Sequence, residues 1–466
     1  MGPYNMGPSI TERLAEFIYY FDNMQLSSEV YEEAKKRIID TIGCAIAAKH
    51  AMKHDNIATR LTSLLRTIFT DGSSTLIGES KKGSSLSASI FNSFLSHSLE
   101  LDDSLPGVGH IGSVVVPVAF AVGEEMHSSG EELLRSVVLG YEIFSRIGSY
   151  NLKGHIQNRG FHPTGINGVF GAAAVASKLR RLNKEEITNA LGLAGGFSSG
   201  LLEAVNDGSW SKRLNPGIAA FNGILATYLA ENQFPGPRTI LEGRLGFYNA
   251  YAGTTENSEE ILKGLGKDMM IFKSKFKPYA SCKIIHPAID AILRLLSDNT
   301  FEASDIENVV VHMQSNGIPL VGSTDKRRPK NQVQAQFSLY YMVAYTILNR
   351  RPPLLEAIRE DSFKDEKILA LAEKVQIFED KQIEPREDNS DLNRVSIVDL
   401  KLRDGRVITM KSRDNFDSMS MQEVIQKFYS ITAGAISNEA AENFIESIMN
   451  IEKKKDITKI LEIDIN

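Results

Sequence analysis

The chain has 466 residues, of which 42% are hydrophobic and 24% are charged, and both values are ordinary for a globular protein. Its formal charge of −6 argues against a surface built mainly to bind nucleic acid or anionic lipid, so an acidic ligand would need a local basic pocket. Because a single hydrophobic core stops growing at roughly 250–300 residues, the length predicts two domains.

The cysteine content and the amino-terminal residues predict an intracellular protein. Only Cys44 and Cys282 occur, and two such distant cysteines cannot form a disulfide framework. The first ten residues lack the basic and apolar regions of a signal peptide. The apolar run at 114–122 has about half of the roughly 20 residues that a membrane-spanning helix needs, and Pro117 interrupts it. We therefore expect a cytoplasmic protein with neither a membrane nor a nucleic-acid partner.

The first half of the chain shows helical periodicity, with apolar residues at spacings of three and four, as in Val30, Ala34 and Ile38. Small residues are dense at 171–176 and 191–196, which favours close packing of helices in a buried bundle. The residues at 1–267 are therefore predicted to form most of a large all-helical domain. The pattern predicts helices at Glu12–Asp22, Ser28–Ala48, Asn56–Thr70, Ser84–His97, Gly130–Ser149, Gly168–Leu182, Lys184–Leu202 and Ala219–Glu231.

After Gly266 the pattern changes to short β-branched or alternating runs. These runs predict strands at Ile306–Met313, Lys374–Phe378, Val395–Leu402 and Val407–Lys411, and Asp404-Gly405 between the last two is a strong hairpin signal. Helical periodicity returns at Met421–Tyr429 and Asn438–Met449. We therefore predict a mainly α protein: a large all-helical domain from 1–267 and 414–466, plus a smaller α+β lid domain at 268–413.

Two motifs near residue 100 suggest cofactors but lack the required context. The residues at 107–112 fit the pattern G-x-G-x-x-G, yet a dinucleotide fingerprint needs a preceding strand, and the residues before 107 do not form one. Glu100, Asp102, Asp103 and His110 are possible ligands for Mg, Mn or Fe. No His pair at i, i+4 supports that hypothesis, and either aspartate could instead cap the turn before a helix. We predict no metal and no organic cofactor.

Four separated segments, each rich in Gly or Pro, carry imidazole, carboxylate and ammonium groups, and they lie at 100–110, 160–165, 208–213 and 277–287. Loops of this kind deliver functional groups onto a rigid scaffold. Histidine suits general acid–base catalysis near neutral pH, and Lys or Arg suits the binding of carboxylates. The combination indicates proton transfer on an anionic small molecule.

Each of these basic residues also has a plainer interpretation. His162 stands just before a predicted helix, where it either faces an anion or is a hydrogen-bonded core residue. Lys212 and Arg213 precede a predicted helix start at about residue 217, where they either bind a polycarboxylate or lie in solvent. His286 stands at the amino-terminal edge of a helix, where the helix dipole would keep it neutral, in a cleft between the domains. The residues alone leave open which histidine is the base.

Taken in this order, the motifs resemble the MmgE/PrpD family, which contains 2-methylcitrate dehydratases, cis-aconitate decarboxylases and an iminodisuccinate epimerase. The resemblance implies a large all-helical domain, an α+β lid, a homodimer and chemistry without metal or organic cofactor. It rests on Glu-Leu-Asp-Asp at 100–103, Gly-Phe-His-Pro-Thr-Gly at 160–165, Gly-Ser-Trp-Ser-Lys-Arg-Leu-Asn-Pro-Gly at 208–217, Lys-Pro-Tyr-Ala-Ser-Cys-Lys-Ile-Ile-His-Pro-Ala-Ile-Asp at 277–290, and Ala-Gln-Phe-Ser at 335–338.

The resemblance implies the site residues Glu100, Ser104, His110, His162, Lys212, His286 and Tyr341, and the charged residues Asp103, Arg213 and Lys277 in the same motifs complete the predicted set. The predicted catalytic residues are His110, His162, Lys212 and His286. The predicted substrate-binding residues are Glu100, Asp103, Ser104, Arg213, Lys277 and Tyr341, with Tyr341 near the pocket mouth. Four places depart from the family pattern: Glu100 replaces Asp, Ser104 replaces Thr, Ile111-Gly112 follows His110 where many relatives have Pro and a small residue, and Asn215 replaces His after the lysine motif.

These departures weaken the resemblance to the decarboxylases in particular. The leading hypothesis is therefore a cofactor-independent lyase for a small polycarboxylate, of the 2-methylcitrate dehydratase type, that uses histidine acid–base chemistry. The alternatives are an activity like that of cis-aconitate decarboxylase or iminodisuccinate epimerase. A further alternative is a catalytically inactive dimer that binds a polycarboxylate.

Overall fold

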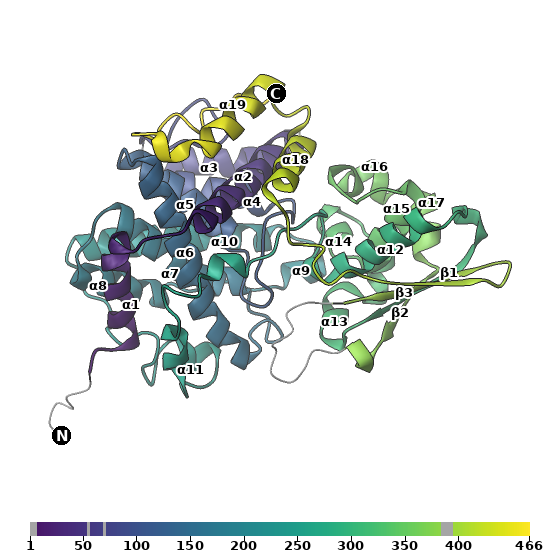
Figure 1. Cartoon of the computed structure of the whole chain (residues 1–466), viewed down its shortest axis with the longest axis horizontal. Coiled ribbons are helices and arrows are strands. Elements are labelled where there is room, and N and C mark those ends of the chain that lie inside the picture. Colours follow the sequence, from purple (N-terminus) through teal and green to yellow (C-terminus); the bar gives the residue numbers. More distant parts are fainter. Residues whose placement is uncertain (1–6, 54–55, 69–70, 384–394) are drawn as a thin grey trace.

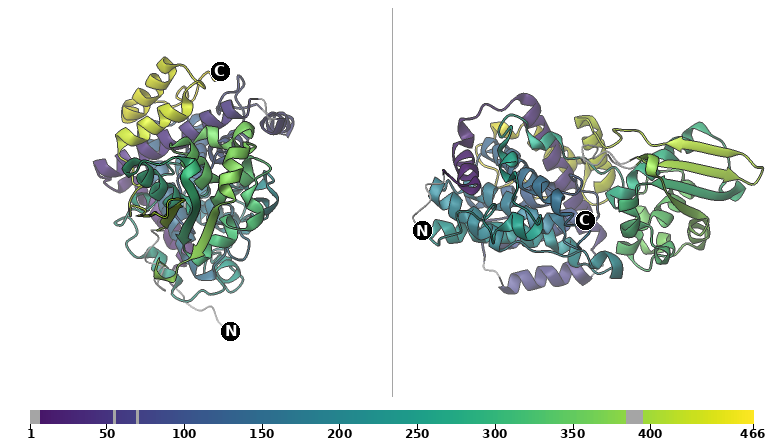
Figure 2. Two further views of the ribbon diagram at one scale, coloured as in Figure 1. Left: turned by 90° about the vertical axis from the view of Figure 1, so that its right-hand side faces the viewer. Right: turned by 90° about the horizontal axis from the view of Figure 1, so that it is seen from below.

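The computed structural model describes residues 7–53, 56–68, 71–383 and 395–466. Figure 1 shows a large group of helices at one end of the molecule and a four-stranded sheet with its own helices at the other. The view from below in Figure 2 shows the same division, with the sheet extending to one side. The predicted fold class, mainly α with a smaller α+β part, is confirmed.

The helical part is centred on α7, which packs against α6 and α10. Small residues permit this packing, because a Cβ atom added at Gly223 of α10 would lie 2.4 Å from the Cβ of Ala172 of α7. The helices of this part are α1 (Ile10–Tyr20), α2 (Ser28–Ala51), α3 (Asn56–Ile68), α4 (Ser85–His97), α5 (Gly112–Glu125), α6 (Gly130–Tyr150), α7 (Pro163–Leu179), α8 (Lys184–Gly196), α9 (Ala204–Asp207), α10 (Ser211–Glu231), α11 (Phe247–Tyr251), α18 (Met421–Thr432) and α19 (Asn438–Met449).

Several helices differ from the sequence prediction, and one of them is α8, which ends at Gly196, six residues before the predicted end at Leu202. The apolar run at 114–122 belongs to α5, which is buried on nearly every side and therefore lacks the amphipathic pattern that reveals a helix. Helix α7 begins at Pro163 and α10 at Ser211, five to eight residues earlier than predicted, and α10 contains Pro216. Among the described residues, no helix is both long and apolar enough to cross a membrane.

The sheet has the strand order β2-β1-β3-β4, from β1 (Ile306–Met313), β2 (Val375–Glu379), β3 (Ile397–Leu402) and β4 (Val407–Lys411). Strands β1 and β2 are parallel, whereas β1 with β3 and β3 with β4 are antiparallel. The predicted hairpin is confirmed, and Gly405 in its turn has φ 90°, a conformation that favours glycine. The predicted start of β3 at Val395 is two residues early.

The helices of this second part are α12 (His286–Asp298), α13 (Ile318–Val321), α14 (Gln332–Gln336), α15 (Leu339–Asn349), α16 (Glu360–Phe363) and α17 (Glu366–Ala372). Helix α12 packs against β3 and β4, and α15 packs against β2. This arrangement buries alternate residues of β1 and β3.

At the carboxyl end of the chain, α18 packs along α2 of the helical part. Lys427 of α18 donates a hydrogen bond of 2.5 Å to Asp40 of α2 and one of 2.7 Å to the carbonyl oxygen of Leu101. Leu101 belongs to the segment that follows α4. Helix α18 therefore holds the loop between α4 and α5 in place.

Candidate active site

A cavity of about 90 Å³ lies between the helical part and the residues that follow 267. This volume is below the roughly 300–1,000 Å³ of typical ligand pockets and suits a small molecule. Six of the predicted site residues line it, namely Glu100, Ser104, His110, His162, Lys212 and Lys277. Its other polar or aromatic lining residues include Gln157, Thr164, Cys282, Lys283 and Phe337.

The loop from the end of α4 to the start of α5 supplies three of these residues. Glu100 has φ 53°, a left-handed conformation that costs a non-glycine residue on the order of 1–3 kcal/mol and is commonest at functional sites. Gly109 has φ 139°, and a Cβ atom there would lie 3.0 Å from the Cα of Thr164. Because Gly109 lacks a side chain, the loop lies close to Thr164, and the backbone N–H of His110 donates a 3.0 Å hydrogen bond to Thr164 Oγ1. The residues at 107–111 thus form a loop at the cavity that leads into α5 at Gly112, and they follow no strand of the sheet, as the sequence predicted.

Glu100 lies between two lysines on the cavity wall. Lys212 Nζ, in the first turn of α10, donates to Glu100 Oε1, and Lys277 Nζ lies 2.9 Å from Glu100 Oε2. Burial alone would raise the pKa of Glu100, but the two ammonium groups hold it well below its usual range. Burial lowers the pKa of Lys212; burial also acts to lower the pKa of Lys277, but the negative charges of Glu100 and Asp102 together outweigh it and raise that pKa. The site therefore presents a carboxylate clamped by two cations.

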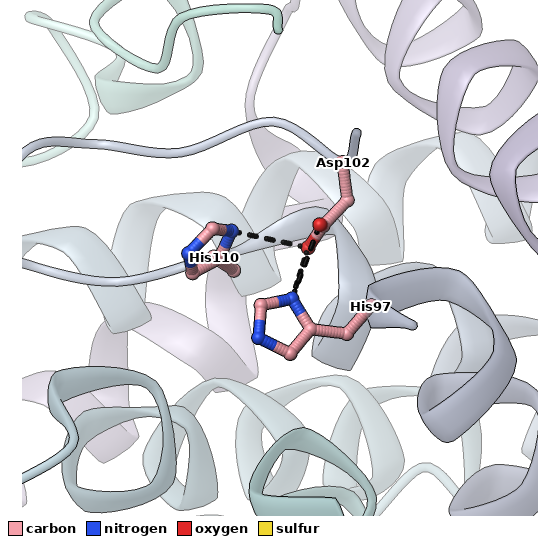
Figure 3. A group of neighbouring side chains, drawn as sticks. All are labelled: His97, Asp102 and His110. Carbon is pink, nitrogen blue, oxygen red and sulfur yellow. Dashed lines mark hydrogen bonds and ion pairs between the residues drawn. The ribbon is translucent and has the colours of Figure 1, made fainter. Parts of the chain in front are cut away.

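A second cluster joins His97, Asp102 and His110, and Figure 3 shows both rings turned toward the carboxylate. His97 Nδ1 lies 3.0 Å and His110 Nδ1 lies 3.2 Å from Asp102 Oδ2. His97 is fully buried, and its Nε2 lies 2.8 Å from Lys212 Nζ. Burial and Lys212 lower the pKa of His97 to about 4, although Asp102 opposes them. The pKa of Asp102 lies well below its usual range because the two histidines outweigh its burial.

The sequence analysis missed His97 and gave Asp102 no part in the site. His97 ends a predicted helix and carried no distinguishing motif, while Asp102 was considered only as a metal ligand or a cap. Their spacing could have indicated the contact. His97 is the last residue of α4 and Asp102 lies in the loop that follows, so the two side chains meet when the chain turns back.

His162 stands immediately before α7 and is 2% exposed. Asn215 Nδ2 lies 3.0 Å from His162 Nδ1 and 3.2 Å from the carbonyl oxygen of Leu201. Burial and the nearby Lys212 hold the pKa of His162 well below its usual range. The positive end of the helix dipole acts in the same direction, so His162 is a neutral imidazole.

The ligand atoms of His97, Asp102 and His110 lie within 4.8 Å of one another, so this cluster is a candidate metal site. Its hydrogen bonds do not fit that role. The Lys212 ammonium donates to His97 Nε2, which places the remaining ring proton of neutral His97 on Nδ1, pointing at Asp102. A nitrogen that carries this proton has no lone pair for a metal.

Three predicted substrate-binding residues do not line the cavity. Asp103 accepts hydrogen bonds from the Gly112 N–H and the Tyr141 hydroxyl, each 2.9 Å long, and so fixes the start of α5. Arg213 points the other way from Lys212 along α10, and its guanidinium lies 3.9 Å from the ring centre of Trp210. Tyr341 donates a 2.7 Å hydrogen bond to the carbonyl oxygen of Ala357. The structure thus gives each of them a partner within the fold.

His286, predicted as catalytic, also lies outside the cavity lining. It is the first residue of α12, as predicted, and burial holds its pKa well below its usual range. Its ring is fully buried, with Nε2 3.2 Å from the Ser281 carbonyl oxygen and its centre 5.0 Å from that of Tyr279. The same segment instead presents Cys282 and Lys283 to the cavity.

These two residues differ in their electrostatics. Burial raises the pKa of Cys282 and keeps it a thiol, consistent with the inert role expected for a buried cysteine. Burial lowers the pKa of Lys283 to about 8, although its ion pair with Asp417, 2.8 Å long, opposes this effect. Lys283 is thus a third basic group at the cavity, and it is paired with Asp417.

Comparison with known families agrees with this geometry. The MmgE/PrpD N-terminal domain matches residues 12–260, and the MmgE/PrpD C-terminal domain matches residues 279–453. The chain belongs to the MmgE/PrpD family. Among its relatives is a cis-aconitate decarboxylase of Aspergillus terreus, 25% identical over 96% of this chain and 95% of that protein. The cis-aconitate decarboxylases of Homo sapiens and Mus musculus are 24% and 23% identical, over 96% and 97% of this chain and 93% of each protein.

These MmgE/PrpD relatives bear on the predicted reaction. All three are named for the decarboxylation of cis-aconitate, and none for the dehydration of 2-methylcitrate. They favour the alternative reaction over the one that the sequence analysis placed first. Full-length similarity to these lyases supports an enzyme, and at identities of 23–25% the reaction itself is a proposal.

Proposed function

We propose that this protein is a lyase that removes CO₂ from a small tricarboxylate of the cis-aconitate type, without a metal or organic cofactor. The observation that carries the proposal is a single small cavity wall on which ammonium groups and imidazoles meet, from Lys212, Lys277, His110 and His162. The decarboxylase relatives support the choice of reaction.

The cavity suits an anion with more than one carboxylate. Lys212 and Lys277 share one counter-charge, Glu100, so the three groups together keep a net positive charge. Lys283 adds a further cation at the rim. Ser104 Oγ is buried at the cavity and makes no hydrogen bond within the described part of the chain, so it is free to donate to a ligand. A hydrogen bond between a charged group and a ligand contributes on the order of 1.5–3 kcal/mol.

The reaction needs electrostatic stabilisation and one proton. The bond to the departing carboxyl group breaks, CO₂ leaves, and its electron pair spreads through the adjacent alkene onto a remaining carboxylate. Ammonium groups at that carboxylate stabilise the developing charge in a site that excludes water. A protonated imidazole then delivers the proton to carbon and is recharged from solvent. His110 and His162 are the imidazoles on the cavity wall.

The test offers purified protein separately to cis-aconitate, 2-methylcitrate, citrate and iminodisuccinate, with products followed by proton NMR and released CO₂. We expect CO₂ and one new alkene product from cis-aconitate alone. An alkene from 2-methylcitrate without CO₂ would replace the proposal with dehydration, and a change in optical rotation with iminodisuccinate alone would replace it with epimerisation. The variant His110→Gln is the control for a contaminating activity, because it should abolish turnover.

The inactive alternative predicts a different result. A protein that only holds a polycarboxylate would bind cis-aconitate in calorimetry and convert none of the four acids. The homodimer implied by the resemblance also stays a prediction. Size-exclusion chromatography with light scattering tests the dimer, and we expect a mass of twice the chain's 51.5 kDa.

A further inference from the structure

The two imidazoles on the cavity wall are held by different partners. His110 Nδ1 faces the carboxylate of Asp102, which can only accept hydrogen bonds, whereas His162 Nδ1 faces the amide nitrogen of Asn215, which can only donate. We infer that these partners fix opposite tautomers, so that His110 Nε2 is the nitrogen that gains and loses the catalytic proton while His162 stays neutral and donates from Nε2–H. This division of roles rests on the proposed function, and Asp102 and Asn215 act in it as positioning residues.

The tautomer of His110 follows from the buried charges around Asp102. The carboxylate is ionised, because its pKa lies well below the usual range. It therefore needs donors, and the Nδ1 atoms of His97 and His110 are both close enough to serve. With Nδ1 protonated, Nε2 of His110 is the only ring nitrogen that can exchange a proton, and Figure 3 shows this nitrogen on the far side of the ring from Asp102. The carboxylate also stabilises the imidazolium that forms when Nε2 is protonated.

The tautomer of His162 follows from the orientation of the Asn215 amide. The carbonyl oxygen of Leu201 accepts from Asn215 Nδ2, which fixes that atom as the amide nitrogen. The same nitrogen lies 3.0 Å from His162 Nδ1, so Nδ1 must accept and the single proton of the neutral ring must sit on Nε2. Burial and the neighbouring cations oppose a second proton on this ring.

The chemical consequence is that one imidazole of the cavity exchanges a proton through Nε2 and the other keeps a hydrogen-bond donor there. A neutral imidazole N–H can polarise a carbonyl or carboxylate without becoming charged, a role known from other enzymes. In decarboxylation, protonated His110 delivers its Nε2 proton to carbon as CO₂ departs, while His162 donates a hydrogen bond to the carboxylate that receives the electron pair. A reaction that begins with removal of a C–H proton uses the same division in reverse, with His110 Nε2 as the base.

The first test reads the tautomers in the resting protein, with the nine histidines labelled with ¹⁵N. Long-range ¹H–¹⁵N spectra distinguish Nδ1–H from Nε2–H, and His110→Gln and His162→Gln each remove one set of signals for assignment. We expect Nε2–H for His162 from pH 6 to 9 and Nδ1–H for neutral His110. A neutral His110 with its proton on Nε2, or a His162 with its proton on Nδ1, overturns the inference. Because no substrate is present, this result is independent of whether the protein decarboxylates anything.

The second test reverses the fixed tautomer. In Asn215→Asp the new carboxylate can only accept, so His162 moves its proton to Nδ1 and loses its donor at the cavity. We expect kcat to fall roughly 10²-fold, the cost of losing one such donor, with little change in KM. The matched control is Asn222→Asp in the same helix, because the one hydrogen bond that Asn222 donates within the described residues goes to the Phe197 carbonyl oxygen, and this variant should retain activity within about twofold. Equal activity of the two variants overturns the assigned role of His162.

The third test weakens the support of His110. Asp102→Asn should lower kcat by about 10²- to 10⁴-fold and move the pH at which activity is lost toward lower values, since the imidazolium loses its counter-charge. Asp40→Asn is a control for the loss of a buried carboxylate, because Asp40 pairs with Lys427 and, within the described residues, forms no ion pair with a histidine. A falling pH limb at the wild-type position in Asp102→Asn contradicts the inference. Four other ionisable groups face the two imidazoles, namely Glu100, Asp102, His97 and Lys212. Their titration must also be considered when the pH profile is interpreted.

Discussion

Removal of the Lys212 ammonium group is the sharpest perturbation that the site offers. The side chain is 7% exposed and contacts both Glu100 and His97, so Lys212→Met keeps most of its volume while deleting one charge. If this ammonium makes one charged hydrogen bond to the substrate, its loss costs on the order of 1.5–3 kcal/mol of binding. That cost corresponds to an increase in the dissociation constant of about 10- to 150-fold. The net positive charge shared by Glu100, Lys212 and Lys277 also falls to zero.

The assay compares wild type and Lys212→Met by isothermal titration calorimetry with cis-aconitate and by steady-state kinetics. The variant leaves Glu100 with only Lys277, and loss of one partner of a buried ion pair costs about 3–5 kcal/mol of stability. The control is therefore Arg146→Met, which breaks the buried pair with Glu142 away from the cavity. We expect a lower melting temperature in both variants, with the larger loss in Arg146→Met because Arg146 also donates to four backbone carbonyl oxygens, but weakened binding only in Lys212→Met. Unchanged binding in that variant, with the fold intact, would refute the reasoning about the cavity.

The remaining predictions concern turnover, metal independence and stability. His162→Gln should lower kcat by about 10²-fold with little change in KM, measured by CO₂ release, because a lost hydrogen-bond donor acts in the transition state. Dialysis against a chelator should leave activity unchanged, since the proton on His97 Nδ1 occupies the nitrogen that a metal would need; loss of activity restored by an added ion contradicts this. Burial raises the pKa of Glu124 from 4.5 to about 7, so its contribution to stability is full below pH 4.5 and is lost as the pH rises through 7. Denaturant titrations at pH 5 and pH 8 measure this effect. Between these pH values the free energy of unfolding of Glu124→Gln should fall by on the order of 3 kcal/mol less than that of wild type. An equal fall in both proteins excludes Glu124 as the cause.

Local sequence patterns determined the fold class and much of the site. Periods of 3.6 and 2 distinguish the helices from the strands because each element buries one face, and Asp404-Gly405 marks the hairpin through its backbone conformation. Residue chemistry drew attention to His162 and Lys212, because loops rich in glycine and proline often carry functional groups, and the resemblance to the MmgE/PrpD family completed the set of six cavity residues. Helix α5 was missed for the same physical reason, because a helix buried on all sides carries no periodic signal.

Tertiary structure decided which of the candidate residues meet. Lys212 and Arg213 are adjacent in sequence, yet a helix turns neighbouring side chains by about 100°, so one faces Glu100 and the other stacks on Trp210. His97 and Lys212 are 115 positions apart and lie within a hydrogen bond of each other. Sequence spacing cannot encode that contact, because it depends on how α4 and α10 pack. The protonation roles of the histidines depend on such distant partners, and for this reason the sequence left them open.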